Sequence, residues 1–147
     1  MGTPSTVKGT PQFMAPELLE QLFGLTITHS TSHGSASTNL YAADIWSLGE
    51  IIFQMLTKQS AFPQLPQLIL YVQNLQPFPN AVLARYGVSS CGQHFISSTM
   101  PHSPDSRLKA IQALNHEWME KYKPYLSPHI ATSTRYCTPS RLCTSRI

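Results

Sequence analysis

The side chains with the most potential for metal or thiol chemistry are three cysteines and six histidines. Cys91, Cys137 and Cys143 form no CxxC pair, and the histidines lack the spacing of a metal site. We therefore expect no metal site in this chain. An odd number of thiols without a disulfide pattern is typical of reduced proteins, which predicts an intracellular, cytoplasmic location.

Charged side chains are scarce, at 12% of the residues, where about 25% is usual for a soluble domain. After Glu120 the chain carries basic residues and no acidic one: Lys121, Lys123, Arg135, Arg141 and Arg146. No aromatic side chains alternate with them at regular spacing, so the pattern favours a solvated basic tail over a nucleic-acid or membrane surface. No apolar run reaches the ~18 residues of a membrane span.

Two stretches of biased composition divide the chain. Residues 25–39, LTITHSTSHGSASTN, are rich in serine, threonine and histidine and predict a surface loop. Residues 124–147 combine prolines with hydroxyl side chains and predict a disordered, basic tail. The remaining length, residues 1–123, fits a single domain that contains the loop as an insertion.

The strongest helical pattern runs from Asp44 to Lys58. At 100° per residue, its apolar side chains cover an arc of roughly 220°, wider than the ~100° stripe of a surface helix. The pattern leaves a narrow polar stripe formed by Ser47, Glu50, Gln54 and Thr57. We therefore expect a central helix with neighbours on most sides, and Asp44 in the position of an N-terminal cap.

Weaker patterns predict three further helices, over Leu65–Asn74, Ser90–Met100 and Arg107–Glu120. In the last of these, one apolar face carries Leu108, Ile111, Leu114 and Trp118. No segment shows the alternation of a β-strand. The expected fold is all-α, with four or five helices and long irregular connections.

Three stretches in this order, GTPQFMAPE, AADIWSLGEIIFQMLTKQSAF and PDSRLKAIQALNHEW, resemble the C-terminal part of a eukaryotic Ser/Thr protein kinase domain. They correspond to the end of the activation segment, the central helix of the large lobe and its closing helices. The resemblance covers roughly residues 5–122, apart from residues 25–39. It implies a partial, helical C-lobe without the β-rich N-lobe.

The resemblance implies roles for the first stretch. Thr10 matches the threonine that contacts the catalytic loop in kinases. Pro11, Phe13 and Met14 match the loop that binds the substrate residue after the phosphoacceptor. Thr6 falls where many kinases carry an activating phosphothreonine; as an isolated residue it is an ordinary hydroxyl near a chain end.

The resemblance also implies structural roles. Glu17 and Arg107 match a buried ion pair between the activation segment and the closing helices, and Asp44 matches the carboxylate that anchors the catalytic loop. Trp46 and Gly49 match residues that allow close helix packing. Taken singly, Glu17 is more often a solvated carboxylate at a helix start, and Asp44 a simple cap.

The residues with which this family transfers phosphate are missing from the 147 residues. The chain has no glycine-rich GxGxxG loop, no VAIK-like strand lysine, no HRD and no DFG, all of which lie upstream of the position of Gly9 in the family order. We therefore expect no catalytic residue and no cofactor in this chain, although complete family domains use ATP and magnesium. Its start points to a truncated kinase domain that is inactive alone.

Two alternatives stay open at this stage: a non-catalytic, pseudokinase-like module that binds a protein partner, and an incomplete chain of a larger, active kinase. Two departures from the family also matter. The spacing from Glu17 to Asp44 is about twice the expected one, and Lys109 and Gln112 replace the usual capping box of the closing helix.

A central helix without the family's catalytic loop should expose part of its apolar surface. We expect exposure among Ile45, Trp46, Leu48, Ile52 and Phe53. Such a patch favours association and makes the chain marginally soluble on its own. A protein substrate or partner is the expected ligand; a nucleic acid or a membrane is not.

Overall fold

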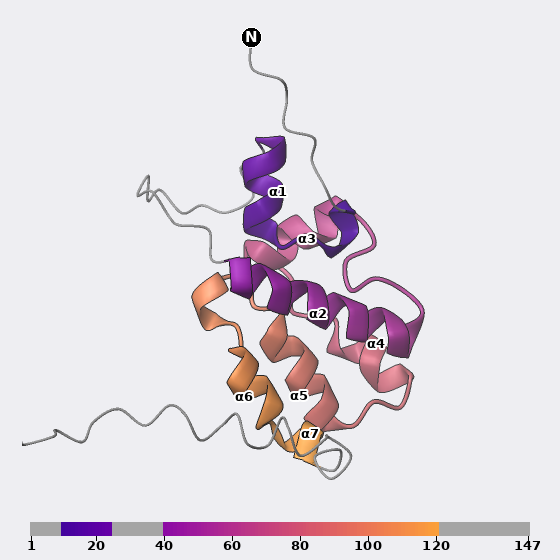
Figure 1. The fold of residues 1–147 in the computed structure, drawn as a ribbon. Helices are drawn as coiled ribbons and strands as arrows, with labels where there is room; N and C mark the ends of the chain where they lie inside the picture. Colours follow the sequence, from indigo (N-terminus) through magenta and orange to yellow (C-terminus); the bar gives the residue numbers. More distant parts are fainter. Residues whose placement is uncertain (1–9, 25–39, 121–147) are drawn as a thin grey trace, which may run out of the picture.

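The structure of the protein is a computed structural model that describes residues 10–24 and 40–120. Within these ranges the regular secondary structure is all helical, with no strand (Figure 1). The elements are the 3₁₀ helices η1 (Pro11–Phe13) and η2 (Pro104–Ser106) and the α-helices α1 (Pro16–Phe23), α2 (Leu40–Thr57), α3 (Leu65–Val72), α4 (Asn80–Arg85), α5 (Ser90–Thr99), α6 (Ala110–Leu114) and α7 (Glu117–Glu120). Thr6, the loop at 25–39 and the tail at 124–147 lie outside the described residues.

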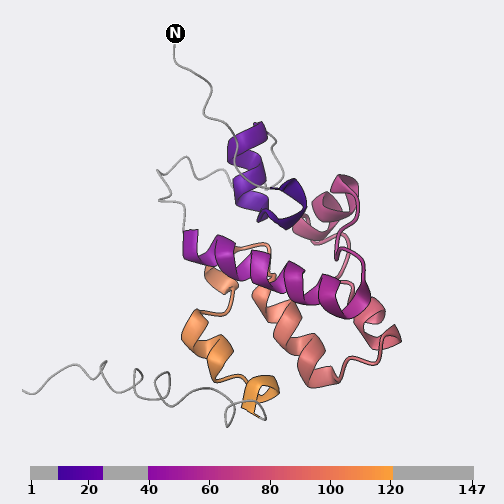
Figure 2. The same ribbon diagram turned by 45° about the vertical axis from the view of Figure 1, so that its right-hand side comes forward.

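Helix α2 runs through the middle of the fold, with α1 and α3 on one side and α5, α6 and α7 on the other (Figure 1). The view from the second angle keeps this order (Figure 2). Trp46 and Phe53 of α2 are buried, as are Leu83 of α4 and Ile96 of α5. These side chains belong to one apolar core, so the prediction of a central helix is confirmed.

The predicted start of this helix was wrong. Helix α2 begins at Leu40, so Asp44 lies inside the helix and is exposed, and it does not cap the helix N-terminus. The four extra residues, Leu40 to Ala43, include two alanines, the strongest helix formers, and contain no glycine or proline. Nothing in this short run interrupts the helix before Asp44.

The polar stripe of α2 faces the inside of the fold. Glu50 and Thr57 are buried, and Ser47 and Gln54 are half-buried. The stripe faces inward because it finds partners there: the Thr57 hydroxyl, for example, lies 2.8 Å from the carbonyl oxygen of Phe53, in α2 itself, and 3.0 Å from that of Gln59, in the loop that follows. Hydrogen bonding of this kind compensates the loss of water.

An apolar face of α2 points outward instead. Leu48, Ile51, Met55 and Leu56 are exposed. Of the five side chains expected to include exposed ones, Leu48 is exposed, Ile45 and Ile52 are half-buried, and Trp46 and Phe53 are buried. The prediction of an exposed apolar surface on this helix is therefore confirmed, with a different set of residues.

The shorter helices follow the sequence in part. Helices α3 and α5 confirm the patterns over Leu65–Asn74 and Ser90–Met100 to within two residues. At the start of α5, the Ser89 hydroxyl accepts a hydrogen bond from the Gly92 N–H at 3.2 Å. Helices α1 and α4 were not predicted, because eight and six residues give too little periodicity to recognise.

The single closing helix predicted over Arg107–Glu120 is wrong. Arg107 follows η2 with an extended backbone, and Asn115 and His116 separate α6 from α7. The His116 ring breaks the helix by accepting a hydrogen bond at Nδ1 from the Trp118 N–H, at 3.1 Å. The predicted apolar face is divided accordingly: Ile111 and Leu114 are exposed.

None of the described helices has the length and apolar character needed to cross a membrane.

Candidate functional site

The first described segment is a tight turn fastened to α2. Pro11 opens η1, where its fixed φ angle suits the first helical position, and the Phe13 and Met14 N–H groups close the turn on the carbonyl oxygens of Thr10 and Pro11 at 3.0 and 3.1 Å. The Ser47 hydroxyl of α2 donates to the Phe13 carbonyl oxygen at 2.8 Å. The polar stripe of α2 therefore holds the segment in place.

The four side chains expected to bind substrate occupy different surroundings. Thr10 and Pro11 are exposed, Phe13 is half-buried and Met14 is buried. Pro11 and Met14 line a cavity of about 710 Å³, and Thr10 and Phe13 are not among its lining residues. The substrate role of the four residues remains a prediction.

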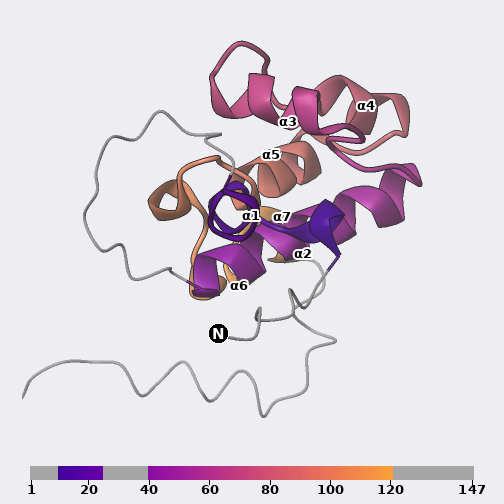
Figure 3. The same ribbon diagram turned by 90° about the horizontal axis from the view of Figure 1, so that it is seen from above.

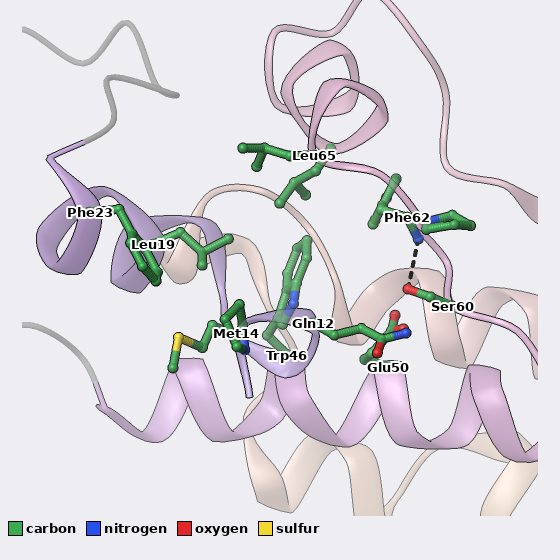
Figure 4. Close-up of a pocket in the computed structure, with 12 residues that line it drawn as sticks. Gln12, Met14, Leu19, Phe23, Trp46, Glu50, Ser60, Phe62 and Leu65 are labelled. Atoms are coloured by element: carbon green, nitrogen blue, oxygen red, sulfur yellow. Dashed lines mark hydrogen bonds between the residues drawn. The ribbon is translucent and has the colours of Figure 1, made fainter. Parts of the chain in front are cut away.

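This cavity lies between η1, α1, α2 and α3, where the view from above places α1 over α2 and α3 to one side (Figure 3). Its lining is mostly apolar: Pro11, Met14, Leu19, Phe23, Trp46, Phe62, Pro63, Leu65 and Leu68, together with Gln12, Glu50 and Ser60. In the close-up, Phe23 and Leu19 form one side, Phe62 and Ser60 the other, and Trp46 and Glu50 rise from α2 below (Figure 4). A volume of this size is typical of ligand pockets.

Glu50 is the polar group at the base of this cavity, and only 1% of its surface is exposed. Its Oε1 accepts a hydrogen bond from the Gln54 side chain at 2.8 Å, and both carboxylate oxygens lie 3.3 Å from the Ala61 N–H. Burial raises the pKa of Glu50 above its ordinary value, and hydrogen bonds from Ser60, Gln54 and Ala61 oppose that shift.

Glu17, in the first turn of α1, and Arg107, directly after η2, form an ion pair. Arg107 Nη1 and Nη2 donate to Glu17 Oε1 and Oε2, each at 2.7 Å, in the two-pronged geometry that favours arginine over lysine. The guanidinium is fully buried and the carboxylate is mostly buried. The pair ties the start of α1 to the segment after α5.

Arg107 has further acceptors around it. Its guanidinium donates to the carbonyl oxygens of Ala42 at 2.9 Å, Pro101 at 2.9 Å and His102 at 3.1 Å. It also stands 5.1 Å from the centre of the Trp46 ring. One cation therefore joins α1, α2 and the loop before η2, and each contact satisfies part of its charge.

Asp44 lies apart from these contacts. Its exposed carboxylate lines a second cavity of about 580 Å³, together with Asp105, Arg107 and Lys109. The role of Asp44 as an anchor for a catalytic loop remains a prediction. Lys109 keeps half of the capping box expected to be lost, because the Gln112 side chain accepts from the Lys109 N–H at 2.7 Å.

The donor groups of the main cavity do not fit magnesium and a nucleotide triphosphate. Its lining has one carboxylate and no lysine or arginine to neutralise phosphates. Elsewhere in residues 10–24 and 40–120, no group of three or more histidine, cysteine, aspartate or glutamate side chains could hold a metal ion.

Sequence reasoning missed Ser47 and Glu50 as site residues. It placed both on a narrow polar stripe and gave them no partner, although a serine and a glutamate one turn apart on an otherwise apolar helix were a usable signal. Polar side chains on a helix that must be buried on most sides need internal partners.

Comparison with known families identifies the fold. The protein kinase domain family matches residues 2–119 of the chain. The chain belongs to this family. In the protein kinase fold, the described helices are part of the helical large lobe, and the sheet of the small lobe has no counterpart in the described residues.

Individual kinases resemble the chain over most of its length. Serine/threonine-protein kinase Nek6 of Oryza sativa subsp. japonica is 30% identical over 139 residues, which cover 92% of this chain and 21% of that protein. MAP kinase kinase kinase SSK2 of Saccharomyces cerevisiae is 31% identical over 116 residues, or 76% of this chain and 6% of that protein. The chain spans only 6% to 26% of the length of the relatives compared.

A solved kinase structure shares the fold. The crystal structure of the Rad53 kinase domain and SCD2 matches with a TM-score of 0.55 and 23% identity, over 76% of this chain and 36% of that one. This likeness supports the fold assignment alone.

Proposed function

We propose that this chain forms the substrate-side part of a Ser/Thr protein kinase domain and binds a peptide segment of a protein substrate in the cavity between η1, α1 and α3. The family activity is transfer of phosphate from ATP to protein serine or threonine. The observation that carries the proposal is the hydrogen bond from Ser47 to the Phe13 carbonyl, which fixes the segment that rims the cavity.

We propose further that the 147 residues transfer no phosphate by themselves. Their sequence contains none of the family motifs that hold the phosphates, the metal ions and the attacking hydroxyl, and stabilisation by those groups accounts for most of the catalysis. A longer protein that supplies these motifs ahead of Gly9 would regain the activity. A cytoplasmic location, inferred from the cysteine pattern, belongs to the same proposal.

A non-catalytic interaction module is the second candidate. The exposed apolar side chains of α2, Leu48, Ile51 and Met55, support it, since they form a surface on which a protein could pack. The two candidates differ in the face they use. A substrate segment would occupy the cavity, and a packing partner would cover the opposite side of α2.

Peptide binding tests the first candidate. A mixture of twelve-residue peptides with a central serine or threonine, titrated against the 147-residue chain, should change the fluorescence of Trp46 in a saturable way. Phe23→Glu should weaken binding about tenfold or more, because Phe23 lines the cavity. Tyr86→Glu is the matched control, since both side chains are 49% exposed and Tyr86 lies at the end of α4.

Unchanged binding by the Phe23→Glu variant, or no binding at all by the wild-type chain, would rule out the cavity as the substrate site. Weaker binding after Ile51→Lys, with Phe23→Glu neutral, would favour the interaction module.

A further inference from the structure

Two histidine rings meet between α5 and the link from α6 to α7, which lie side by side (Figure 1). His94 Nδ1 lies 2.9 Å from His116 Nε2, and the ring centres are 5.2 Å apart. These two distances fit rings that meet edge to edge through their nitrogen atoms, with a hydrogen bond between the two nitrogens. His94 is exposed and His116 is half-buried.

A backbone N–H fixes where the protons of this pair lie. The Trp118 N–H is 3.1 Å from His116 Nδ1, and a backbone N–H can only donate, so this nitrogen must carry a lone pair. A neutral imidazole has a single N–H, which places the His116 proton on Nε2, from where it donates to His94 Nδ1. The hydrogen bonds therefore run in one direction, from Trp118 through His116 to His94.

This arrangement accepts both rings only in their neutral form. An imidazolium carries a proton on each of its nitrogens. A proton added to His94 would point at the Nε2–H of His116, and a proton added to His116 would point at the Trp118 N–H. In either case two donors face each other, so the uptake of one proton breaks one of the two hydrogen bonds.

The same hydrogen bonds hold α7 against α5. The ring of His116 packs edge-on against Phe95 of α5, and the Trp118 indole packs on the same Phe95, each with 5.1 Å between ring centres. Trp118 also lies against Gly92, where a Cβ atom would come within 3.0 Å of the indole. A break at His116 therefore loosens the contact between these helices.

Other titratable side chains lie on the elements around the pair: Cys91 on α5, Lys109 before α6, and Glu117 and Glu120 on α7. Glu117 is exposed and follows His116 directly in the sequence. A carboxylate near an imidazole favours its charged form, which opposes the exclusion of a proton by the pair. A variant without this carboxylate separates the two effects.

We propose that His94 and His116 form a proton-controlled latch, which holds α7 on α5 while both rings are neutral and opens as they take up protons. Histidine is the side chain whose charge ordinarily changes between about pH 5 and about pH 8, so the latch responds in that range. Opening frees Trp118 from Phe95 and Gly92. The latch does not depend on peptide binding in the main cavity.

A coupling between two nitrogen nuclei tests the closed latch in the wild-type chain. In chain labelled with nitrogen-15, at about pH 8, a nitrogen–nitrogen coupling across the hydrogen bond should join His94 Nδ1 to a protonated His116 Nε2, and it should vanish at about pH 5. No such coupling at the higher pH, or one that persists at the lower pH, overturns the proposal. This measurement needs no variant.

Hydrogen exchange of the Trp118 amide measures the opening. Its protection should fall about tenfold or more from about pH 8 to about pH 5, while the amide of Phe53, in the core helix α2, stays protected. In His116→Asn, a neutral amide oxygen takes over as acceptor for the Trp118 N–H, so the protection should not depend on pH. His102→Asn, which replaces a histidine outside the pair, is the matched control and should respond as the wild type does.

The remaining outcomes also decide the matter. Constant protection of Trp118 in the wild type, or an unchanged fall in His116→Asn, overturns the latch. A parallel loss at Phe53 would mean that the whole core unfolds, which contradicts a local release of α7. Glu117→Gln should keep the response, and a response lost in this variant would assign it to the carboxylate instead of the histidine pair.

Discussion

Glu17 and Arg107, ninety positions apart in the sequence, show how a few side chains hold this fold together. Few other charges are available for this purpose, since only 12% of the residues are charged. The pair fixes the start of α1 to the residue that follows η2. Arg107 is wholly buried and Glu17 is partly accessible to water. Loss of the Glu17 carboxylate therefore leaves a buried, uncompensated positive charge, which costs more than a partly solvated negative charge.

Replacement of Glu17 by glutamine should therefore destabilise the fold. We expect a loss of ~3–5 kcal/mol in the free energy of unfolding, because the variant leaves a buried guanidinium without its counter-charge. Urea denaturation followed by Trp fluorescence measures this. Glu117→Gln, an exposed carboxylate in a helix first turn, should change the free energy by less than about 1 kcal/mol. Equal effects of the two substitutions would contradict the role of the pair.

The buried Glu50 carboxylate should make stability depend on pH. Burial raises its pKa above the ordinary value of 4.5, so the folded chain keeps a proton that the unfolded chain loses. Its contribution to stability is therefore fully present below pH 4.5 and is lost as the pH rises through the folded-state pKa.

Comparison with Glu50→Gln isolates this effect from other titrating groups. The difference in free energy of unfolding between wild type and variant should be constant below the ordinary pKa of glutamate. At higher pH the wild type should lose stability relative to the variant. Denaturation curves at several pH values from about 4 to about 8 measure it. A difference in free energy of unfolding that stays constant over this pH range would contradict a raised pKa of Glu50 in the folded chain.

Among the elements, α2 shows what the sequence could and could not predict. Its central position follows from an apolar arc that is too wide for a surface helix. Which side faces the core does not follow, because the partners of Ser47 and Glu50 come from η1 and from the turn at Ser60–Ala61. Side-chain periodicity contains no information about such long-range acceptors and donors.

The closing helices show a second limit. Apolar spacing over Arg107–Glu120 fits one helix, yet a single ring, that of His116, competes for the Trp118 N–H and ends the run. Local competition of this kind depends on the rotamer of one side chain. The bidentate contact between Glu17 and Arg107 was expected from the family resemblance and could not have come from spacing alone.

Close packing between α2 and α5 rests on Gly49. A Cβ atom at this position would collide with Thr99 Oγ1 and with the Met100 side chain, both of which are fully buried. Gly49→Ala should therefore cost ~1–3 kcal/mol, although alanine is by itself the better helix former by ~1 kcal/mol.

Thermal or urea unfolding of Gly49→Ala checks this expectation. Met55→Ala serves as the control on the same helix, since Met55 is 76% exposed and its truncation should change stability by about 0.5 kcal/mol or less. A more stable Gly49→Ala variant would mean that helix propensity outweighs the contact, and the packing argument would fail.

At the scale of the whole molecule, the exposed apolar side chains of α2 govern association. We expect the 147-residue chain to self-associate as its concentration rises, as predicted from the sequence. The double substitution Ile51→Lys with Met55→Lys should reduce association without loss of stability, because both side chains point outward.

Sedimentation velocity and light scattering at increasing concentration measure the association. Leu75→Lys is the control, since Leu75 is comparably exposed and lies after α3, away from this face of α2. A wild-type chain that stays monomeric throughout, or a Leu75→Lys variant that is as effective as the double substitution, would show that the α2 face does not drive association.

For the whole molecule, the central proposal is that these 147 residues bind a peptide and transfer no phosphate. The measurement that tests it most directly is transfer of labelled phosphate from Mg·ATP to the peptide mixture, in a sample shown to bind those peptides. The account predicts no incorporation above that of a sample without the chain. Incorporation that rises in proportion to the concentration of the chain, and that is unaffected by its further purification, would contradict it.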